Sequence, residues 1–248
     1  MSSLSVGSAD TTLAADRSAL ARRERLFFSG MAIALTVVAF VGFAPTYYLK
    51  AHFGTPALSP LLHWHGALFT AWMLLLVAQT SLVAAGRTSV HRKLGVLGVV
   101  LAVAMVVIGA AVAITRAQQG VLGPPGAPSV VFLVVPIVGI VVFPILFGIA
   151  IYFRRRPDIH KRLVLIGTTE LVTAAVGRLP GVVAFGIPAI FALTDLFVLA
   201  IAVYDYRTRG RIHPATLWGG LFLIASQPLR LFIGGTAVWQ SFATWLIS

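Results

Sequence analysis

The 248-residue chain contains no cysteine and few acidic residues, and only 10% of its residues are charged. Without thiols it cannot form disulfides, thiolate metal sites, cysteine-held iron–sulfur clusters or c-type haem attachments. A soluble domain carries roughly 25% charged residues, so this chain lacks the ionic surface that contact with water on all sides requires. The composition therefore excludes several redox centres and argues against a soluble fold.

Long apolar runs fill most of the sequence, which is 58% hydrophobic with a mean hydropathy of +0.95. A membrane-spanning helix needs about 20 mostly apolar residues. The runs predict an all-α, polytopic membrane protein built as a seven-helix transmembrane bundle. The predicted spans are residues 26–49, 60–85, 94–115, 130–153, 161–179, 181–204 and 214–233. Pro136 and Pro144 are expected to bend the fourth span, and Pro228 the seventh.

Fifteen of the 19 basic residues lie in four places, which recur after every second apolar run. This distribution follows the positive-inside rule and predicts that the N-terminus is inside and the C-terminus outside. The net charge of +12 is then explained by orientation and by contact with anionic lipids at the cytoplasmic face, so we expect no nucleic-acid binding. The basic stretches are residues 17–25, 87–93, 154–162 and 207–211.

The sequence divides into three segments. Residues 1–22 are rich in Ser, Ala and Thr and are predicted to form a disordered or interfacial cytoplasmic tail. Residues 23–235 form the transmembrane helical domain, and its first run is too long for a signal peptide, so we expect a retained helix. Residues 236–248 are too short to cross the bilayer. With Trp239 and Trp245 they are expected to form an amphipathic interfacial helix at the outer surface.

Polar and ionisable side chains inside the predicted spans require an explanation. An Arg or Asp at a helix centre costs about 2.5–3.5 kcal/mol, and such residues normally face the bundle interior or a wet cavity. At about 1.5 Å per residue, Glu170 and Asp195 should lie near the middle of the membrane. Those expected in the outer third are His63, His65, Arg178 and Arg230, with Gln227 one turn below Arg230.

Helical phase predicts which of these side chains face each other. His65, Trp72 and Gln79 are seven residues apart and share one stripe of the second span. Gln227 and Arg230 share a face of the seventh span. We therefore expect an outer cavity above the two mid-membrane carboxyls, and a candidate ion pair between Glu170 and Arg178. The predicted lining is His65, Arg178, Gln227 and Arg230, with Glu170 and Asp195 beneath.

Five histidines at the membrane boundaries suggest a haem or metal centre with a redox role, as in b-type cytochromes. Neutral imidazole binds haem iron and other metals, and Arg178 and Arg230 would suit haem propionates. The inner and outer histidines lie about one bilayer thickness apart, so a bis-histidine haem requires two inner histidines, and a single outer ligand is the alternative. The outer histidines are His63 and His65, and the inner ones are His91, His160 and His213.

Two further hypotheses remain open. The first is a proton-coupled transporter or binder of a small anionic solute, in which Arg178 and Arg230 hold a carboxylate or phosphate while Glu170 or Asp195 carries the proton. The second is a structural or assembly factor of a membrane complex or homo-oligomer, in which the polar groups only lock helices together. The sequence contains no motif that identifies a reaction, so it does not decide whether the protein is an enzyme.

Several histidine-containing elements recur along the chain, namely His63-x-His65-Gly66, His91-Arg92-x-Leu94-Gly95 and His160-Lys161-Arg162-Leu163, and Trp72 and Gln79 lie between the first two. In these elements and residues the chain after about residue 25 resembles a group of bacterial inner-membrane proteins without an assigned function. The resemblance implies a multi-pass protein of the bacterial cytoplasmic membrane and adds nothing about its chemistry.

Overall fold

The computed structural model describes the backbone of residues 4–248 and the side chains of residues 18–248. Residues 4–248 form helices and connecting turns without a β-strand. The α-helices are α1 (Leu4–Phe43), α2 (Pro60–Ala84), α3 (Thr88–Gln118), α4 (Ser129–Phe132), α5 (Val134–Tyr152), α6 (Pro157–Val176), α7 (Gly186–Arg209), α8 (Pro214–Gly234) and α9 (Ala237–Ile247). A π-helix, η1 (Ala44–Tyr48), follows α1, and a 3-10 turn, η2 (Val182–Phe185), precedes α7.

Six helical stretches in the described part of the chain are long and apolar enough to cross a membrane. They are Ser18–Tyr48, Pro60–Ala84, Thr88–Gln118, Ser129–Tyr152, Val182–Arg209 and Pro214–Gly234. The protein thus has the multi-pass helical character that its composition predicted. Helix α6 is not among the six, because Lys161, Arg162 and Glu170 interrupt its apolar sequence.

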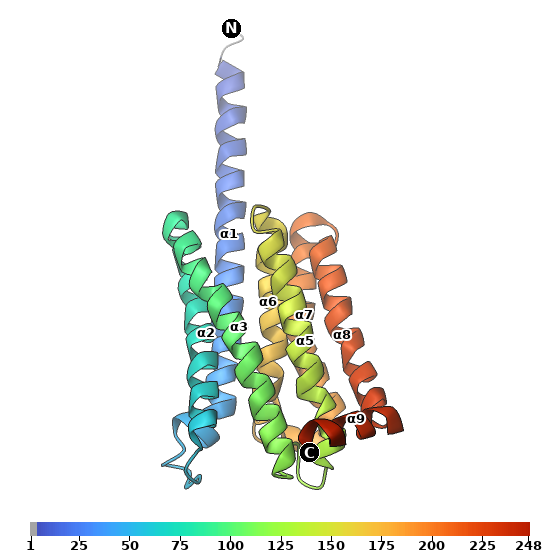
Figure 1. The fold of residues 1–248 in the computed structure, drawn as a ribbon. Coiled ribbons are helices and arrows are strands. Elements are labelled where there is room, and N and C mark those ends of the chain that lie inside the picture. The colour runs from blue at the N-terminus through green and yellow to red at the C-terminus, as the bar shows by residue number, and fades with distance from the viewer. Residues whose placement is uncertain (1–3) are drawn as a thin grey trace.

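The helices form one bundle with α6 in its interior (Figure 1). Helix α6 packs against α1, α5, α7 and α8, whereas α2 and α3 pair with each other beside α1 and α5. More than half of the 20 residues of α6 are buried. Its neighbours therefore shield Arg162 and Glu170 of α6 from the surroundings of the bundle.

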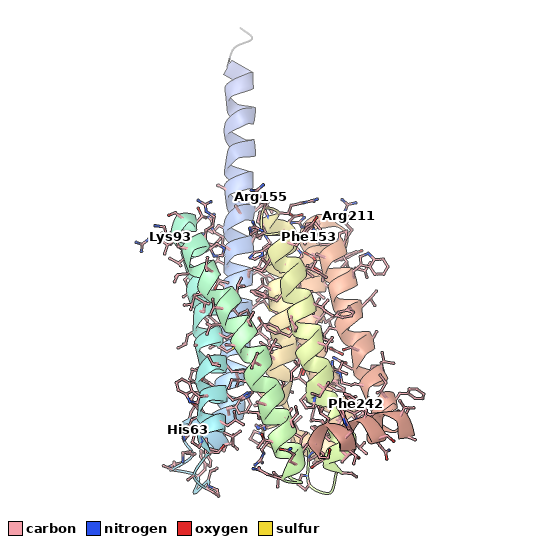
Figure 2. All side chains as sticks on the ribbon, in the orientation of Figure 1. His63, Lys93, Phe153, Arg155, Arg211 and Phe242 are labelled. Carbon is pink, nitrogen blue, oxygen red and sulfur yellow. The ribbon has the colours of Figure 1, made fainter. Side chains whose placement is uncertain are left out.

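The two ends of the bundle differ in composition (Figure 2). Lys93, Arg155 and Arg211 lie at one end, hereafter the basic end, and α1 extends beyond it. His63 and Phe242 lie at the opposite end, hereafter the far end. Helix α9 lies across the far end, where Trp239 Nε1 donates a hydrogen bond to the Val130 carbonyl at 3.0 Å (Figure 1).

Local sequence explains where several helices begin and end. Ser59 caps α2 by accepting a hydrogen bond from the Leu62 amide, and a proline follows at the first helical position. Helix α8 likewise begins with a proline, after His213 as its cap. Helix α7 ends at Gly210, whose φ of 67° is a left-handed conformation that glycine adopts at little cost.

Some helix boundaries differ from the predicted ones. Helix α1 begins at Leu4, so its backbone is helical within the predicted tail at residues 1–22. Helix α3 begins at Thr88, six residues before the predicted span, so Arg92 and Lys93 of the basic stretch belong to the helix and Arg87 precedes it as the cap. Helices α4 and α5 divide near Leu133, since Pro136 has no N–H to donate to the carbonyl four residues earlier.

Two further expectations concern helix ends and bends. The predicted span 181–204 starts as the 3-10 turn η2 and continues as α7 to Arg209. Pro144 and Pro228 lie inside α5 and α8, and both helices continue past them. Helix α7 is therefore displaced toward the basic end relative to the prediction, which brings Asp205 into its last turns.

Candidate functional site

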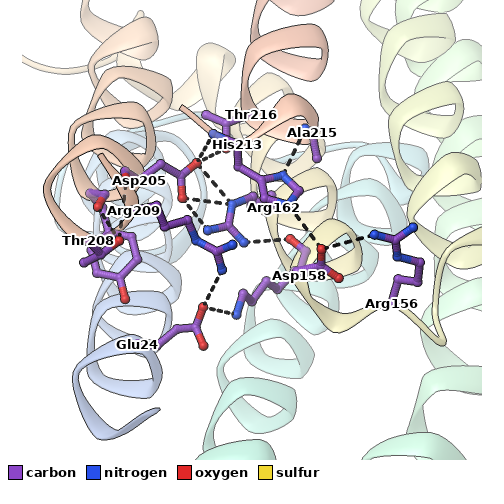
Figure 3. Close-up of polar contacts among 12 residues, drawn as sticks. Glu24, Arg156, Asp158, Arg162, Asp205, Thr208, Arg209, His213, Ala215 and Thr216 are labelled. Carbon is purple, nitrogen blue, oxygen red and sulfur yellow. Dashed lines mark hydrogen bonds and ion pairs between the residues drawn. The ribbon is translucent and has the colours of Figure 1, made fainter. Parts of the chain in front are cut away.

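A buried ion pair joins α6 to α7 at the basic end (Figure 3). Arg162 Nε lies 3.0 and 3.1 Å from the two carboxylate oxygens of Asp205, its Nη2 also contacts Asp205, and both side chains are fully buried. Thr216 on α8 donates its hydroxyl to Asp205 Oδ2 at 2.5 Å. Arg162 also donates to the Asp158 carbonyl at 2.7 Å. The pair is thus fully hydrogen-bonded, which is the condition under which a buried charge is tolerated.

His213 belongs to the same network (Figure 3). Its Nδ1 accepts a hydrogen bond from the Ala215 amide at 3.1 Å, so its Nε2, which lies 3.2 Å from Asp158 Oδ2, is the donor. Its backbone amide donates to Asp205 at 3.3 Å. Burial, and then the charge of Arg162, lower the pKa of the His213 imidazole below 6.5, and Asp158 opposes this shift. His213 is therefore a neutral helix cap.

A second buried ion pair lies further along α6. Arg230 on α8 donates from Nη1 and Nη2 to the two carboxylate oxygens of Glu170, at 2.8 and 3.2 Å. The guanidinium also donates to the Ser226 hydroxyl at 2.7 Å, and it lies 5.4 Å from the centroid of the Phe191 ring. Arg230 is fully buried and Glu170 nearly so. This arrangement corrects the expected pairing of Glu170 with Arg178.

Asp195 and Gln227 form a separate contact between α7 and α8. Gln227 Nε2 donates to Asp195 Oδ1 at 2.7 Å. Gln227 is buried, whereas Asp195 is only half-buried. No ion pair involves Asp195 among the residues whose side chains are described.

Two of the three inner histidines come together at the basic end. The ring centroids of His91 on α3 and His160 on α6 are 6.3 Å apart, with the rings 83° from parallel. His160 Nδ1 donates to the Ala150 carbonyl at 2.8 Å, so the lone pair of its imidazole lies on Nε2. The side chain of Gln79 on α2 lies near Gly95, which is one helical turn from His91 along α3. Gln79, His91 and His160 are hereafter the histidine site.

Among the side chains of residues 18–248, the buried polar atoms without a hydrogen-bond partner lie on α2 and α3. Within the described side chains, the buried nitrogen and oxygen atoms that form no hydrogen bond are His65 Nδ1, Gln79 Oε1 and His91 Nδ1. Buried polar atoms are almost always paired, so each exception calls for an explanation such as a bound molecule. Two of these three atoms belong to the histidine site.

The predicted stripe of α2, formed by His65, Trp72 and Gln79, faces the bundle, but its three side chains lie at different depths and have different neighbours. Trp72 is buried, packs edge-on against Phe143 and Phe147, and donates to the Thr168 hydroxyl at 3.3 Å. His65 lies about 10 Å from it toward the far end and Gln79 about 10 Å toward the basic end. Trp72 is therefore a packing residue between two separate polar positions.

The four residues predicted to line an outer cavity have different partners. Arg178 lies past the end of α6, where its guanidinium is 4.7 Å from the Phe43 ring centroid and donates to the Ala174 carbonyl at 2.7 Å. Gln227 and Arg230 engage Asp195 and Glu170 instead. A far-end cavity of about 200 Å³ has other lining residues, namely Ala57, Ser59, Leu61, Leu62, Val112, Thr115, Arg116 and Gln119.

The arrangement also corrects the expected partners of a haem. The inner histidine pair stands near the start of α6, whereas Arg178 follows its end, 18 residues or about 27 Å away. Arg230 is occupied by Glu170. Neither arginine is therefore placed to contact propionates at the histidine site. His63 is exposed at the far end, and its carbonyl accepts a hydrogen bond from Tyr47 at 3.3 Å.

Arg162 and Asp205 are buried charges that the sequence did not predict. Arg162 belongs to a predicted basic linker, and Asp205 follows the predicted end of the sixth span. The available signal was the scarcity of acidic residues, of which the chain has seven, so each one close to an apolar run needed a partner.

Comparisons with known proteins do not extend these observations, because no family model, curated protein or solved structure matches the chain. Among the described side chains, no three His, Cys, Asp or Glu residues come close enough to hold a metal ion together.

Proposed function

We propose that the protein is a seven-span protein of the bacterial cytoplasmic membrane, with α6 as the seventh span and the N-terminus inside. Two observations support α6 as a span. It has 20 residues, about the length that crosses a membrane, and it packs against four helices in the interior of the bundle. A shielded helix tolerates polar residues that a lipid-facing helix does not. The basic residues gathered at one end support the orientation.

An odd number of spans places the two termini on opposite sides of the membrane, whereas an even number places them on the same side. With α6 as a span, a reporter fused after Ser248 lies outside the cytoplasm, and a reporter in the linker at 154–156 lies inside. Six spans would place both reporters on the cytoplasmic side. A cytoplasmic signal from the C-terminal fusion would therefore contradict the seventh span.

Within this membrane protein, the proposed function is one-electron redox chemistry at a haem b held by His91 and His160. The observation that carries the proposal is their 6.3 Å separation across two helices. Two imidazoles bound to one metal ion, at metal–nitrogen distances of about 2.0–2.1 Å, bring their ring centroids to about 6 Å. The separation is thus one at which a single iron could take both as ligands.

A haem agrees better with this pair than a bare metal ion does. The pair supplies only two protein ligands, and no third His, Cys, Asp or Glu joins it among the described side chains. A porphyrin supplies four nitrogens and needs only axial ligands from the protein. Bound haem would contribute an iron that alternates between two oxidation states.

The surrounding residues have roles that do not depend on the iron. The Ala150 carbonyl fixes the His160 tautomer, as a hydrogen bond to the remote nitrogen does for most metal-binding histidines. The unpaired Gln79 Oε1 is an acceptor within the same region. Arg87 and Arg92 flank His91 and are exposed, so they replace Arg178 and Arg230 as expected partners of carboxylate groups on a ligand.

An absorbance spectrum of the detergent-purified protein, with metal analysis, tests the proposal. We expect a Soret band and stoichiometric iron, both lost in His91→Ala and in His160→Ala. His52, exposed in the turn after η1, provides the matched control, and His52→Ala should retain the band. Colourless, iron-free protein from haem-replete cells, or a band that survives in both variants, would overturn the proposal.

The alternative of anion transport through Arg178 and Arg230 is less well supported. Arg230 is saturated by Glu170 and Ser226, and releasing it would leave a buried carboxylate unpaired. The two ion pairs instead fit the hypothesis that polar groups lock helices together. We assign that structural role to α6, α7 and α8, and the redox role to the histidine site.

A further inference from the structure

Glu170, Asp195 and Asp205 lie on α6 and α7, and only two of these three carboxyl groups have a cationic partner. Asp205 is paired with Arg162, and Glu170 is paired with Arg230. The third, Asp195, receives only the neutral amide of Gln227, at 2.7 Å. Each arginine thus balances one carboxylate, and none of the described side chains carries a positive charge against Asp195.

Asp195 lies at a depth where an unbalanced charge is costly. It is the tenth residue of α7, about 14 Å from the far-end start of the helix and about 21 Å from its last residue, Arg209. Translocon scales give about 2.5–3.5 kcal/mol for a charged aspartate at a helix centre. A neutral carboxylic acid avoids this cost and still accepts the hydrogen bond from Gln227.

Asp195 also differs from the other two carboxyl groups in accessibility. Asp205 is fully buried and Glu170 is nearly so, whereas Asp195 is half-buried. Its neighbours Leu196 and Leu199 on α7 are exposed on the side of the bundle. Asp195 therefore reaches the apolar surface of the bundle, while the buried Gln227 donates a hydrogen bond to its carboxyl group from the interior.

We propose that Asp195 is a proton-binding site in the middle of the membrane, neutral in its resting state and accessible from the apolar surface. Glu170 on α6 lies close enough to Asp195 for their charges to interact, and Arg230 on α8 neutralises Glu170 in a bidentate pair. Deprotonation of Asp195 would add a second negative charge near Glu170, whose own charge is already balanced by Arg230. The proton is thus held by charge balance, and Gln227 orients the carboxyl group.

This site is independent of the proposed haem. The histidine site lies at the basic end, whereas Asp195 lies near mid-depth on α7 and contacts α8. Its role as a proton carrier would suit a membrane redox protein as well as a proton-coupled transporter. The proton site therefore stands whether or not the haem proposal holds.

Reaction with two carbodiimides tests the proposal on the full-length protein in vesicles. A carbodiimide adds the O–H of a protonated carboxyl group across one C=N bond, so the acid is consumed and an acylisourea forms. We expect hydrophobic dicyclohexylcarbodiimide to label Asp195, with the label located by mass spectrometry and decreasing as pH rises. A water-soluble carbodiimide should not label it. Asp195→Asn should abolish the label, because the amide oxygen preserves the Gln227 contact but has no acid proton.

Infrared spectroscopy gives a second measurement that does not depend on access of a reagent. The difference spectrum between the wild type and Asp195→Asn should contain the carbonyl band of a protonated carboxylic acid at neutral pH. A carboxylate band in its place, or a label found on Glu170 or Asp205, would overturn the proposal. His91→Ala should leave the Asp195 label unchanged, which separates failure of this site from failure of the haem.

Discussion

The polar residues of α6, α7 and α8 differ from those of α2 and α3 in how completely they are hydrogen-bonded. The first group contains both buried ion pairs, and its buried polar side chains have partners. The second group carries no buried ion pair among the described side chains, yet it contains His65, Gln79 and His91, the residues with unpaired buried atoms. Satisfied polar networks fix a structure, whereas unsatisfied atoms are where a ligand or water can bind. The buried ion pairs therefore make α6, α7 and α8 rigid, whereas the unpaired atoms of α2 and α3, two of them beside His160 of α6, mark a binding position.

The largest expected effect comes from breaking the Arg162–Asp205 pair. Arg162→Ala leaves a fully buried carboxylate without its counter-charge, and loss of one partner of such a pair typically costs about 3–5 kcal/mol. We expect a large drop in the thermal unfolding temperature in detergent and in the yield of monodisperse protein. Size-exclusion chromatography and a thermal shift assay measure both.

Arg156 provides the matched control for this prediction. It contacts Asp158 at 3.7 Å and is 64% exposed, so Arg156→Ala should cost less than about 1 kcal/mol. Equal losses in Arg162→Ala and Arg156→Ala would show that burial of the pair does not matter. In that case α6 would not be the rigid element that the comparison requires.

A second prediction tests the packing of α6 without changing charge. A Cβ atom at Gly42 on α1 would lie 2.3 Å from the Ala175 backbone carbonyl on α6, so Gly42→Ala must push the two helices apart. Overpacking of this kind costs about 1–3 kcal/mol. At Gly30 on the same helix an added Cβ meets nothing within 4 Å, so Gly30→Ala should leave stability unchanged or slightly raised. Thermal unfolding of both variants in one detergent decides between them.

The sequence was sufficient to predict the long apolar helices, because a membrane-spanning helix requires a long apolar run, but it did not predict that α1 begins at Leu4 within the expected tail. It also predicted that two inner histidines were required for a bis-histidine site, since depth follows from residue number. It did not predict that His91 and His160 are the pair while His213 caps α8. Helical phase gives the face of a side chain, but not the helix that packs against that face.

The same reason explains the errors in ion pairing. Glu170 and Arg178 are two turns apart on one helix, and this proximity in sequence favoured them as partners. In the bundle α8 packs against α6, so Arg230 approaches Glu170 from the side and Arg178 extends beyond the helix end. Partners separated by 43 and 60 residues depend on helix order, which no local pattern encodes.

A third prediction uses pH to disturb the satisfied side of the molecule. Burial and the charge of Arg162 lower the pKa of His213, whose unperturbed value is 6.5. Below about pH 6.5 the unfolded chain binds a proton that the folded protein resists, so stability is complete above this pH and decreases as the pH falls. Protonation of Nδ1 also removes the acceptor that caps α8. Thermal unfolding between pH 7.5 and about pH 5 should show this decrease, and His213→Asn should reduce the slope while His52→Asn should not.

The smallest expected effect tests the comparison most directly, because the same substitution is made at one glutamine of α2 and at one glutamine of α8. Gln79 has a buried carbonyl oxygen without a partner, so Gln79→Leu in the haem-free protein removes an unsatisfied group and should raise stability by up to about 1 kcal/mol. Gln227→Leu removes the donor to Asp195 and should lower stability by about 1 kcal/mol. Opposite signs in matched thermal unfolding curves would support the division between a binding side and a rigid side. A loss of stability in Gln79→Leu equal to that in Gln227→Leu would mean that Gln79 has a structural partner, and the histidine site would lose its unsatisfied acceptor.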